Sequence, residues 1–232
     1  MKIDGSVALV TGANRGLGAE FARQLLDRGA ARVYGAVRDP DRLRDDRVVP
    51  VRLDVTDRGS IEAAAAIATD VTLLINNAGI MTGARVLGDE DQLRREIEVN
   101  YLGTVAVTRA FAPILAANGG GAVINVLSVL SWLTLPTTGG YSAAKAASWA
   151  ATNALRHELH DNATKVLALH VGFMDTDMTK EVEAPKAAPS DIAAKALDGL
   201  EAGEQEVLAD DTSRHVKAAL AGPPSNLYPT VA

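Results

Sequence analysis

The sequence predicts an α/β fold with one doubly wound, mainly parallel, seven-stranded sheet and helices on both faces. Short runs rich in β-branched residues alternate with longer Ala-rich segments, an order that predicts right-handed βαβ units. Most of the short runs are almost continuously apolar, as is typical of parallel strands buried on both faces. The 232 residues, 47% of them hydrophobic, are enough to bury one large core. We therefore expect a single domain over residues 1–232.

The strands are expected wherever an apolar run is bounded by polar or glycine-containing segments. These runs cover residues 7–12, 32–37, 48–55, 71–79, 121–128, 165–171 and 205–210. Pro50 falls inside the third run. Because proline cannot donate to a strand ladder, we expect this strand to begin late or to lie towards an edge of the sheet.

The helices are expected where apolar residues recur at helical spacing. These segments cover residues 16–28, 60–69, 89–118, 140–161 and 190–202. Gly29 is expected to cap the first helix at its C-terminus, and Ser190 with Asp191 the last one at its N-terminus. Residues 222–232, which begin Gly-Pro-Pro, are expected to form an irregular tail.

Composition excludes several classes of function. A net charge of −6 argues against broad electrostatic binding to nucleic acid or anionic lipid. The absence of cysteine rules out disulfides and thiolate metal sites, and we expect no metal. The N-terminal segment lacks the blocks of a signal peptide, and no apolar run approaches the roughly 20 residues that span a bilayer. We expect a cytoplasmic protein.

A glycine-rich turn, TGANRGLG at 11–18, joins the first strand to the first helix. Glycine allows positive φ and close approach of a ligand, and the free N–H groups of a helix N-terminus favour an anion. No Gly-Lys-Ser/Thr follows, so the turn is not a Walker-type loop. Gly12, Gly16 and Gly18 therefore predict a phosphate-binding turn at the start of the first helix, of a different kind from the Walker loop.

The order of motifs resembles the short-chain dehydrogenase/reductase family. TGANRGLG is followed by LDVTD at 53–57, NNAG at 76–79 and YSAAK at 141–145, with Asn100 and Ser128 between them. The resemblance covers about residues 4–180. It implies a Rossmann-type fold and hydride transfer between a nicotinamide dinucleotide and a carbonyl compound or secondary alcohol.

The reacting centre is expected around Tyr141 and Lys145, which are four positions apart and so share a helix face. An ammonium near a phenol favours the phenolate and lowers its pKa, which suits Tyr141 as general acid/base. Ser128, directly after the fifth apolar run, is expected to bond the substrate oxygen, with Ser131 as the alternative. The resemblance assigns Asn100 the fourth catalytic position, where it binds a water that links Lys145 to solvent.

The cofactor is expected to be NADP(H). Arg38 stands at the end of the second strand, where an acidic residue would indicate NAD. Together with Arg15 in the glycine-rich turn, it could bind the 2′-phosphate that distinguishes NADP from NAD. Asp39 keeps NAD(H) open as the alternative. The resemblance implies that Asp54 contacts the adenine amino group, that Val55 flanks the ring, and that Asn76 also supports the sheet. The cofactor contacts expected in all are Gly12, Asn14, Arg15, Gly16, Leu17, Gly18, Arg38, Asp54, Val55, Asn76, Ala78, Gly79, Tyr141, Lys145, Gly172 and Thr176.

The segment after the sixth strand departs from the family pattern, because Val171 stands where the family has proline. Thr176 is at the place of the family's carboxamide-binding threonine, with Thr179 the less favoured alternative. His170 lies in an apolar run, and a structural role is expected. Residues 173–190 would form a short substrate loop. The substrate pocket is expected to be apolar and to be lined by Leu130, Trp132, Phe173 and Met174.

These observations predict an NADP(H)-dependent oxidoreductase that reduces a modestly sized apolar ketone or aldehyde. The alternatives are an NAD-dependent alcohol dehydrogenase and a dinucleotide-binding sensor or scaffold with little turnover. The resemblance further implies a homodimer or homotetramer formed through the helices at 89–118 and 140–161.

Overall fold

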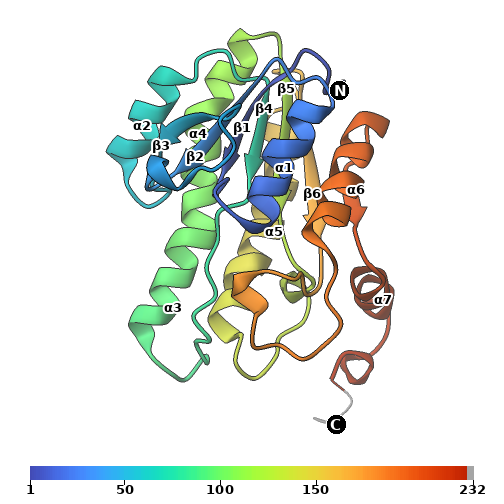
Figure 1. The fold of residues 1–232 in the computed structure, drawn as a ribbon. Coiled ribbons are helices and arrows are strands. Elements are labelled where there is room, and N and C mark those ends of the chain that lie inside the picture. Colours follow the sequence, from blue (N-terminus) through green and yellow to red (C-terminus); the bar gives the residue numbers. More distant parts are fainter. Residues whose placement is uncertain (229–232) are drawn as a thin grey trace.

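The fold is a parallel sheet between two layers of helices, as predicted. The computed structural model describes residues 1–228 (Figure 1). All strand pairings are parallel, and the seven strands lie in the order β3-β2-β1-β4-β5-β6-β7. The strands are β1 Val7–Thr11, β2 Arg32–Val37, β3 Val49–Arg52, β4 Leu73–Asn76, β5 Gly121–Val126, β6 Thr164–His170 and β7 Glu206–Leu208.

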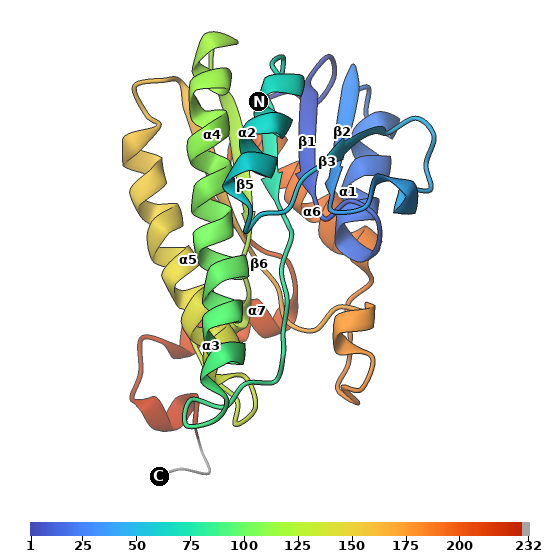
Figure 2. The same cartoon turned by 90° about the vertical axis from the view of Figure 1, so that its left-hand side faces the viewer.

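The helices cover both faces of the sheet (Figures 1 and 2). α1 and α6 pack on one face, and α2, α4 and α5 pack on the other. The α-helices are α1 Gly16–Asp27, α2 Arg58–Ile67, α3 Glu90–Ile97, α4 Gly103–Ala117, α5 Gly139–Glu158, α6 Pro189–Ala202 and α7 Asp211–Ala219. Short 3-10 turns occur at Pro40–Arg42, Val129–Ser131, Asp177–Thr179 and Pro224–Asn226.

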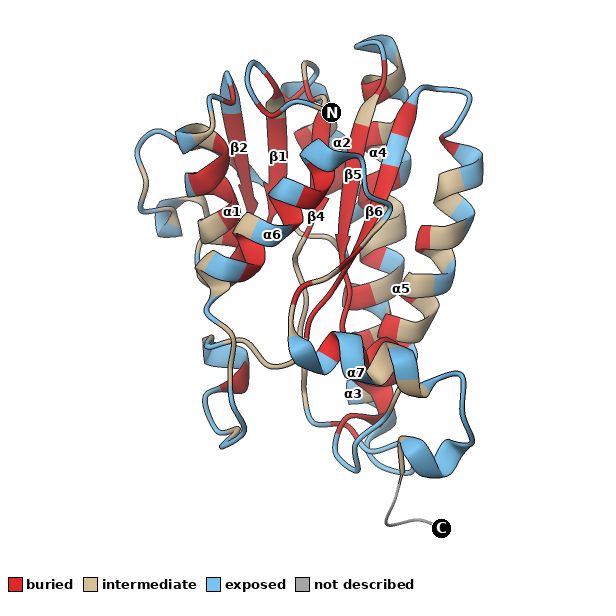
Figure 3. Cartoon of the chain, turned by 90° about the vertical axis from the view of Figure 1, so that its right-hand side faces the viewer, coloured by how far each residue is buried: buried red, intermediate tan, exposed pale blue. Residues whose placement is uncertain are grey.

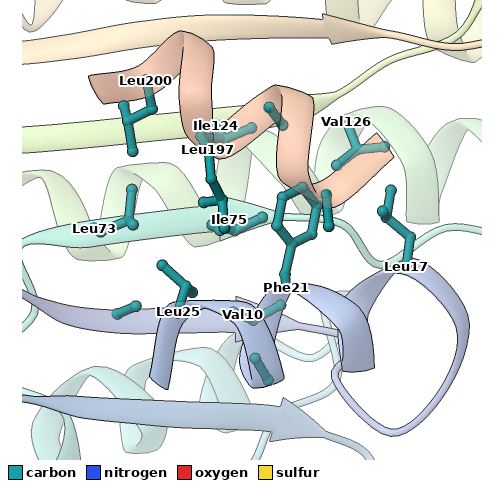
Figure 4. Close-up of a cluster of buried hydrophobic side chains, with 14 of the residues drawn as sticks. Val10, Leu17, Phe21, Leu25, Leu73, Ile75, Ile124, Val126, Leu197 and Leu200 are labelled. Atoms are coloured by element: carbon teal, nitrogen blue, oxygen red, sulfur yellow. The ribbon is translucent and has the colours of Figure 1, made fainter. Parts of the chain in front are cut away.

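The strands form the buried centre of the molecule (Figure 3). Beneath α1 and α6, Phe21 and Leu25 pack with Ile75 and Leu197 (Figure 4). Apolar burial of this kind stabilises by about 25 cal/mol for each Å² removed from water. Both faces of β4 are buried, which explains its uninterrupted apolar sequence.

Most of the expected elements are present, and Pro50 lies in β3 at the edge of the sheet, as its missing N–H required. Gly29 follows the end of α1 with φ +87°, and its N–H donates to the carbonyl of Leu26. The expected cap at Ser190 is wrong, because α6 already begins at Pro189. Proline suits a first helical position, since no intrahelical partner for its N–H would exist there.

The single helix expected at 89–118 is three continuous segments. Between α3 and α4 lies one wider π turn, Glu98–Leu102, which contains Asn100. A π turn adds a residue to the helix and disturbs its regular hydrogen bonds, and such turns recur at functional sites. Apolar periodicity alone does not reveal this insertion.

Helix α7 was not expected from the sequence. It is short, and Asp210 and Ser213 form a capping box at its start, with the Ser213 N–H donating to Asp210 at 2.7 Å. Part of the expected tail is ordered, because Tyr228 accepts a hydrogen bond from the Thr134 N–H at 3.0 Å. Residues 229–232 of that tail lie outside the described residues.

One helical segment, Glu90–Ala117, is long and apolar enough to cross a membrane by length and composition alone. Its most apolar window is 33% buried inside the protein. Core helices of soluble proteins pass the same test, and within this fold the segment packs against α2, α5 and the sheet.

Candidate active site

A cleft of about 1160 Å³ opens at the carboxyl ends of the strands. It begins at the glycine turn after β1, passes the ends of β2 and β4, and reaches the segments after β5 and β6. The chain winds in opposite directions from β1 and β4, so these two neighbours form the switch point of the sheet. Ligands of doubly wound sheets bind at this point.

The glycine turn forms one wall of the cleft. Gly12 and Gly16 have φ of +70° and +54°, in the left-handed region that glycine tolerates best. Both line the cleft, as do Asn14, Arg15 and Leu17. Gly18 does not line it, contrary to the expected cofactor contact. A side chain there would overlap the Gly12 carbonyl, so Gly18 allows α1 to pack closely against the turn.

The ends of β1 and β4 are joined by Thr11 and Asn77. The buried Thr11 hydroxyl accepts from the N–H groups of Asn77 and Ala78 at 2.9 and 3.0 Å and donates to the Ile75 carbonyl at 3.3 Å. The Asn77 amide donates back to the Thr11 carbonyl at 2.9 Å. Sequence reasoning missed both residues. Their signal was a polar residue at the end of each of two apolar strands.

Asn76 is not placed as a cofactor contact. Its side chain is buried and donates to Thr108 in α4 and Asn125 in β5, at 2.9 and 2.8 Å. It therefore supports the sheet, as also expected, while Ala78 and Gly79 line the cleft.

The β2 end of the cleft is rich in charge. Arg38, Asp39 and Arg42 line it together with Asp54 and Val55. Arg42 pairs with Asp39 at 3.2 Å, and both side chains are exposed. Burial pushes the pKa of Asp54 upward, but hydrogen bonds from Thr56 and the nearby Arg38 charge outweigh it and hold the pKa below its ordinary value.

The expected substrate loop is closed at its base by two hydrogen bonds. Asp175 donates to Ala187, and Ala187 donates to Phe173, at 3.0 and 2.8 Å. Close to that base, Asp177 forms an ion pair with Arg15, which connects the loop to the glycine turn, and both residues line the cleft.

Two threonines were candidates to contact the carboxamide. Thr176 lies beside the glycine turn, where a Cβ on Gly16 would be 3.2 Å from its methyl group. Thr179 is buried and turns its hydroxyl to the Met174 carbonyl. The placement therefore favours Thr176. Gly172 also lines the cleft and donates its N–H to Asp210 at 2.7 Å.

Ser128, Tyr141 and Lys145 meet at the inner end of the cleft, and all three are buried. Ser128 follows β5 and accepts from the Leu130 N–H at 3.1 Å. Tyr141 and Lys145 share a face of α5, with the ammonium 5.6 Å from the centre of the phenol ring. Lys145 donates to the Val126 carbonyl at 2.7 Å. Ser131, the alternative serine, turns its hydroxyl to the Ser128 N–H.

The proton affinities of this group are set mainly by burial. Burial, with the Glu96 charge, raises the pKa of Tyr141 to about 12, although a hydrogen bond with Ser128 acts in the lowering direction. Burial lowers the pKa of Lys145 to about 8. In the protein alone, burial of the Tyr141 phenol therefore outweighs the lowering effect of the hydrogen bond with Ser128.

Asn100 lies in the π turn, next to the segment that follows β4. Its buried side chain holds the backbone of Ile80 twice, accepting from the N–H and donating to the carbonyl, each at 2.9 Å. Its own carbonyl accepts from the Ser148 hydroxyl of α5 at 2.9 Å. Asn100 therefore connects the chain after β4 to the helix that carries Tyr141, without lining the cleft itself.

The chain matches the family model for short chain dehydrogenases over residues 6–187. It belongs to the short-chain dehydrogenase/reductase family. A cis-4-hydroxycyclohexanecarboxylate dehydrogenase of Sinomonas cyclohexanicum is 34% identical over 92% of this chain and 93% of the relative.

Solved structures of short-chain dehydrogenases have the same fold. One from Burkholderia cenocepacia, in complex with NADP, is 42% identical with a TM-score of 0.94, over 99% of this chain and 98% of that one. One from Burkholderia phymatum, in complex with NAD, is 26% identical with a TM-score of 0.83, over 97% and 98%. The chain is thus an oxidoreductase of this family, and a nicotinamide dinucleotide is its cofactor class.

The substrate pocket of this short-chain dehydrogenase differs from expectation at Trp132. Leu130, Phe173 and Met174 line the cleft, but Trp132 does not. Its ring stacks on His170 at 3.8 Å between centroids and meets Trp149 edge-on at 6.0 Å. The turn at Val129–Ser131 directs the ring away from the cleft, which local sequence does not predict.

His170 has a structural position, as expected, behind Ser128. It is fully buried, and its Nδ1–H donates to the Ser128 carbonyl at 3.3 Å. Burial lowers its pKa from the ordinary 6.5 to about 4. The unfolded chain therefore binds a proton more readily than the folded one between these two values.

We predict that His170 makes this protein less stable in mild acid. Above pH 6.5 the titration of His170 does not lower the free energy of unfolding, and as the pH falls from 6.5 towards 4 it lowers this free energy progressively. Between pH 7 and pH 5 the loss amounts to about 2 kcal/mol. Urea unfolding of His170→Gln should show a correspondingly smaller drop in the free energy of unfolding between pH 7 and 5. Replacing the exposed His157 by glutamine is the control and should leave the wild-type drop unchanged. An equal drop in His170→Gln and the wild type would contradict this assignment.

Proposed function

We propose that the protein is an NADP(H)-dependent carbonyl reductase that also oxidises the corresponding secondary alcohol. The observation that carries this proposal is the buried group of Ser128, Tyr141 and Lys145 at the inner end of a cleft that starts at a glycine turn. A protein that only sensed a dinucleotide would have no need of a hydroxyl, a phenol and an ammonium gathered at one point.

The residues of the cleft fit a dinucleotide. Gly12 and Gly16 leave room beside a helix N-terminus for a pyrophosphate, and the low pKa of Asp54 keeps a hydrogen-bond acceptor available for an adenine amino group. Lys145 would hold the ribose hydroxyls near the reacting centre. When bound, the nicotinamide supplies or accepts the hydride.

The protein's own part in reduction is to bind the carbonyl and supply a proton. The Ser128 hydroxyl donates to the carbonyl oxygen and stabilises the negative charge that develops there. Tyr141 transfers its phenol proton to that oxygen as hydride reaches the carbonyl carbon, and the product is an alcohol. The Lys145 ammonium stabilises the phenolate left behind. In oxidation each transfer is reversed.

The two directions of the reaction need different protonation states of Tyr141. Because its pKa is raised to about 12, the phenol keeps its proton at neutral pH and is ready to donate it. Oxidation needs the phenolate, which becomes more available as pH rises. A positively charged nicotinamide beside the ring would lower the pKa and assist oxidation.

The preference for NADP(H) is supported by the charges at the rim of the cleft. Arg38 is exposed there, and Arg15 stands at the glycine turn, where it is paired with the exposed Asp177. The carboxylate that would favour NAD, Asp39, is paired with Arg42. A relative 42% identical was solved with NADP, which supports the same choice, whereas the 26% identical relative with NAD keeps the alternative in view.

An apolar substrate of modest size is supported by the inner wall of the cleft, formed by Met81, Leu130, Phe173 and Met174. The Sinomonas relative, by its name, dehydrogenates a hydroxyl on a cyclohexane ring, which is an alcohol of comparable size.

Replacing Arg38 by alanine should weaken NADPH binding about tenfold or more and leave NADH binding nearly unchanged, because a charge-assisted bond to the extra phosphate is lost. Calorimetric titration with both dinucleotides measures this. The control is Arg44→Ala, which removes an exposed arginine that does not line the cleft. Equal losses for both dinucleotides, or unchanged NADPH affinity in Arg38→Ala, would favour the NAD alternative.

Replacing Tyr141 by phenylalanine should reduce carbonyl-dependent NADPH consumption roughly 100-fold or more while NADPH still binds, because only the proton donor is removed. Absorbance assays over a panel of ketones and aldehydes measure the loss. Tyr34→Phe is the control. The Tyr34 hydroxyl donates to Asp70 at 2.9 Å, and neither residue lines the cleft. Tight NADPH binding by the wild type without turnover of any carbonyl would instead support a sensor.

A further inference from the structure

A buried carboxylate in α3 has no part in the mechanism above. Glu96 is fully buried, although glutamate is rarely buried without a partner. Its Oε1 accepts from both the N–H and the hydroxyl of Thr82, at 2.6 and 2.9 Å. Its Oε2 has no hydrogen-bond partner among residues 1–228. Burying a charged oxygen in this way costs free energy, so its position calls for a physical cause.

The unpartnered oxygen lies against the start of the helix that carries the catalytic tyrosine. A Cβ on Gly140 would overlap Glu96 Oε2, so only glycine leaves room for the carboxylate at this point. Gly140 is the second residue of α5, and Tyr141 follows it directly.

Helix α5 has no local anion at its N-terminus. Its first turn contains no acidic residue, and the N-cap residue Thr138 makes no side-chain capping bond. The N-terminus of a 20-residue helix carries partial positive charge, which a nearby carboxylate stabilises. Glu96 supplies that negative charge from a different helix.

The same carboxylate holds the segment that follows β4. Thr82 lies in this segment, between Met81, which lines the cleft, and Ala84, whose carbonyl accepts from the Gly140 N–H at 3.2 Å. Glu96 is therefore hydrogen-bonded to the residue that follows Met81 and packed against the first turn of α5.

We propose that Glu96 is a positioning residue of the reacting centre, which fixes the Thr82 segment against α5 and places a negative charge behind Tyr141 so that the phenol retains its proton. The inference deepens the proposed function and rests on Tyr141 acting as the proton donor. It agrees with the direction in which the Glu96 charge moves the pKa of Tyr141, which is upward.

The other groups around the phenol act differently. Lys145 lies on the same helix, and Ser128 faces the ring from the end of β5 with a hydroxyl that favours the phenolate. Arg95 and Glu98 also line the cleft. Among residues 1–228, Glu96 is the carboxylate that combines full burial with a place against the first turn of α5, so water screens its charge little.

The test is Glu96→Gln, which keeps an oxygen for Thr82 and removes the charge. Phenolate absorbance is measured against pH in Glu96→Gln and in the wild type. The curve of the same protein carrying Tyr141→Phe is subtracted from each, so that the difference reports Tyr141 alone. The midpoint should fall by about half a unit to one unit in Glu96→Gln. Within the range where circular dichroism shows the proteins folded, the rise of alcohol oxidation with pH should move down by the same amount.

Two further variants separate charge from structure. Glu90→Gln removes an equal but exposed charge from the same helix and should leave the midpoint in place. Thr82→Val removes one hydrogen bond to Glu96 but keeps the charge, so it should lower stability without moving the midpoint. If Glu96→Gln does not fold, a midpoint shift in Thr82→Val would overturn the inference.

Failure of this inference is distinguishable from failure of the proposed function. An unchanged midpoint in folded Glu96→Gln, with carbonyl reduction intact in the wild type, overturns the role of Glu96 alone. A shifted midpoint supports that role even when no carbonyl compound is reduced, because the titration does not depend on turnover.

Discussion

The junction between the carboxyl ends of β1 and β4 determines where the reacting groups lie. There the Thr11 hydroxyl accepts hydrogen bonds from two backbone N–H groups of the turn after β4. The Asn77 side-chain amide donates a hydrogen bond to the Thr11 carbonyl. Side-chain bonds continue from Asn76 to Asn125 and from Asn125 to Thr152 in α5, at 2.8 and 2.9 Å. A series of hydrogen-bonded side chains thus connects the glycine turn, through the ends of β1, β4 and β5, to the helix that carries Tyr141. Because buried polar groups are costly when unpaired, this network favours one register of the strands.

The two ends of the cleft differ in how they use charge. Around Arg38 and Arg42 the charged groups are exposed, so they attract an anion without a large desolvation cost and are screened by salt. At the inner end Tyr141 and Lys145 are buried, as is Glu96 against α5, and burial is the main cause of the shifted proton affinities of Tyr141 and Lys145. Under the proposed function, binding of the dinucleotide and transfer of the proton would therefore take place in different dielectric environments of the same protein.

The sequence predicted what depends on local pattern. The apolar runs gave the strands, Pro50 indicated an edge, and the ordered motifs brought Ser128, Tyr141 and Lys145 to one place. The misses depend on contacts distant in sequence. Trp132 turns away from the cleft because His170 and Trp149 offer it a stacking site, and Glu96 is buried only because α5 packs over α3. The π turn at Asn100 changes a helix by a single residue, which apolar spacing does not resolve.

The most direct measurement of the central claim compares NADPH affinity in Thr11→Val and Thr72→Val. Both threonines bond across β1 and β4, but Thr72 does so at the amino end, where its hydroxyl accepts from the Val7 N–H at 3.1 Å. Both variants should be less stable, by about 1–3 kcal/mol for each buried group left unpaired. Calorimetric titration of the folded proteins should show NADPH affinity reduced about tenfold in Thr11→Val and unchanged in Thr72→Val. Wild-type affinity in Thr11→Val, or equal losses in both variants, would contradict the claim that this junction sets the geometry of the cleft.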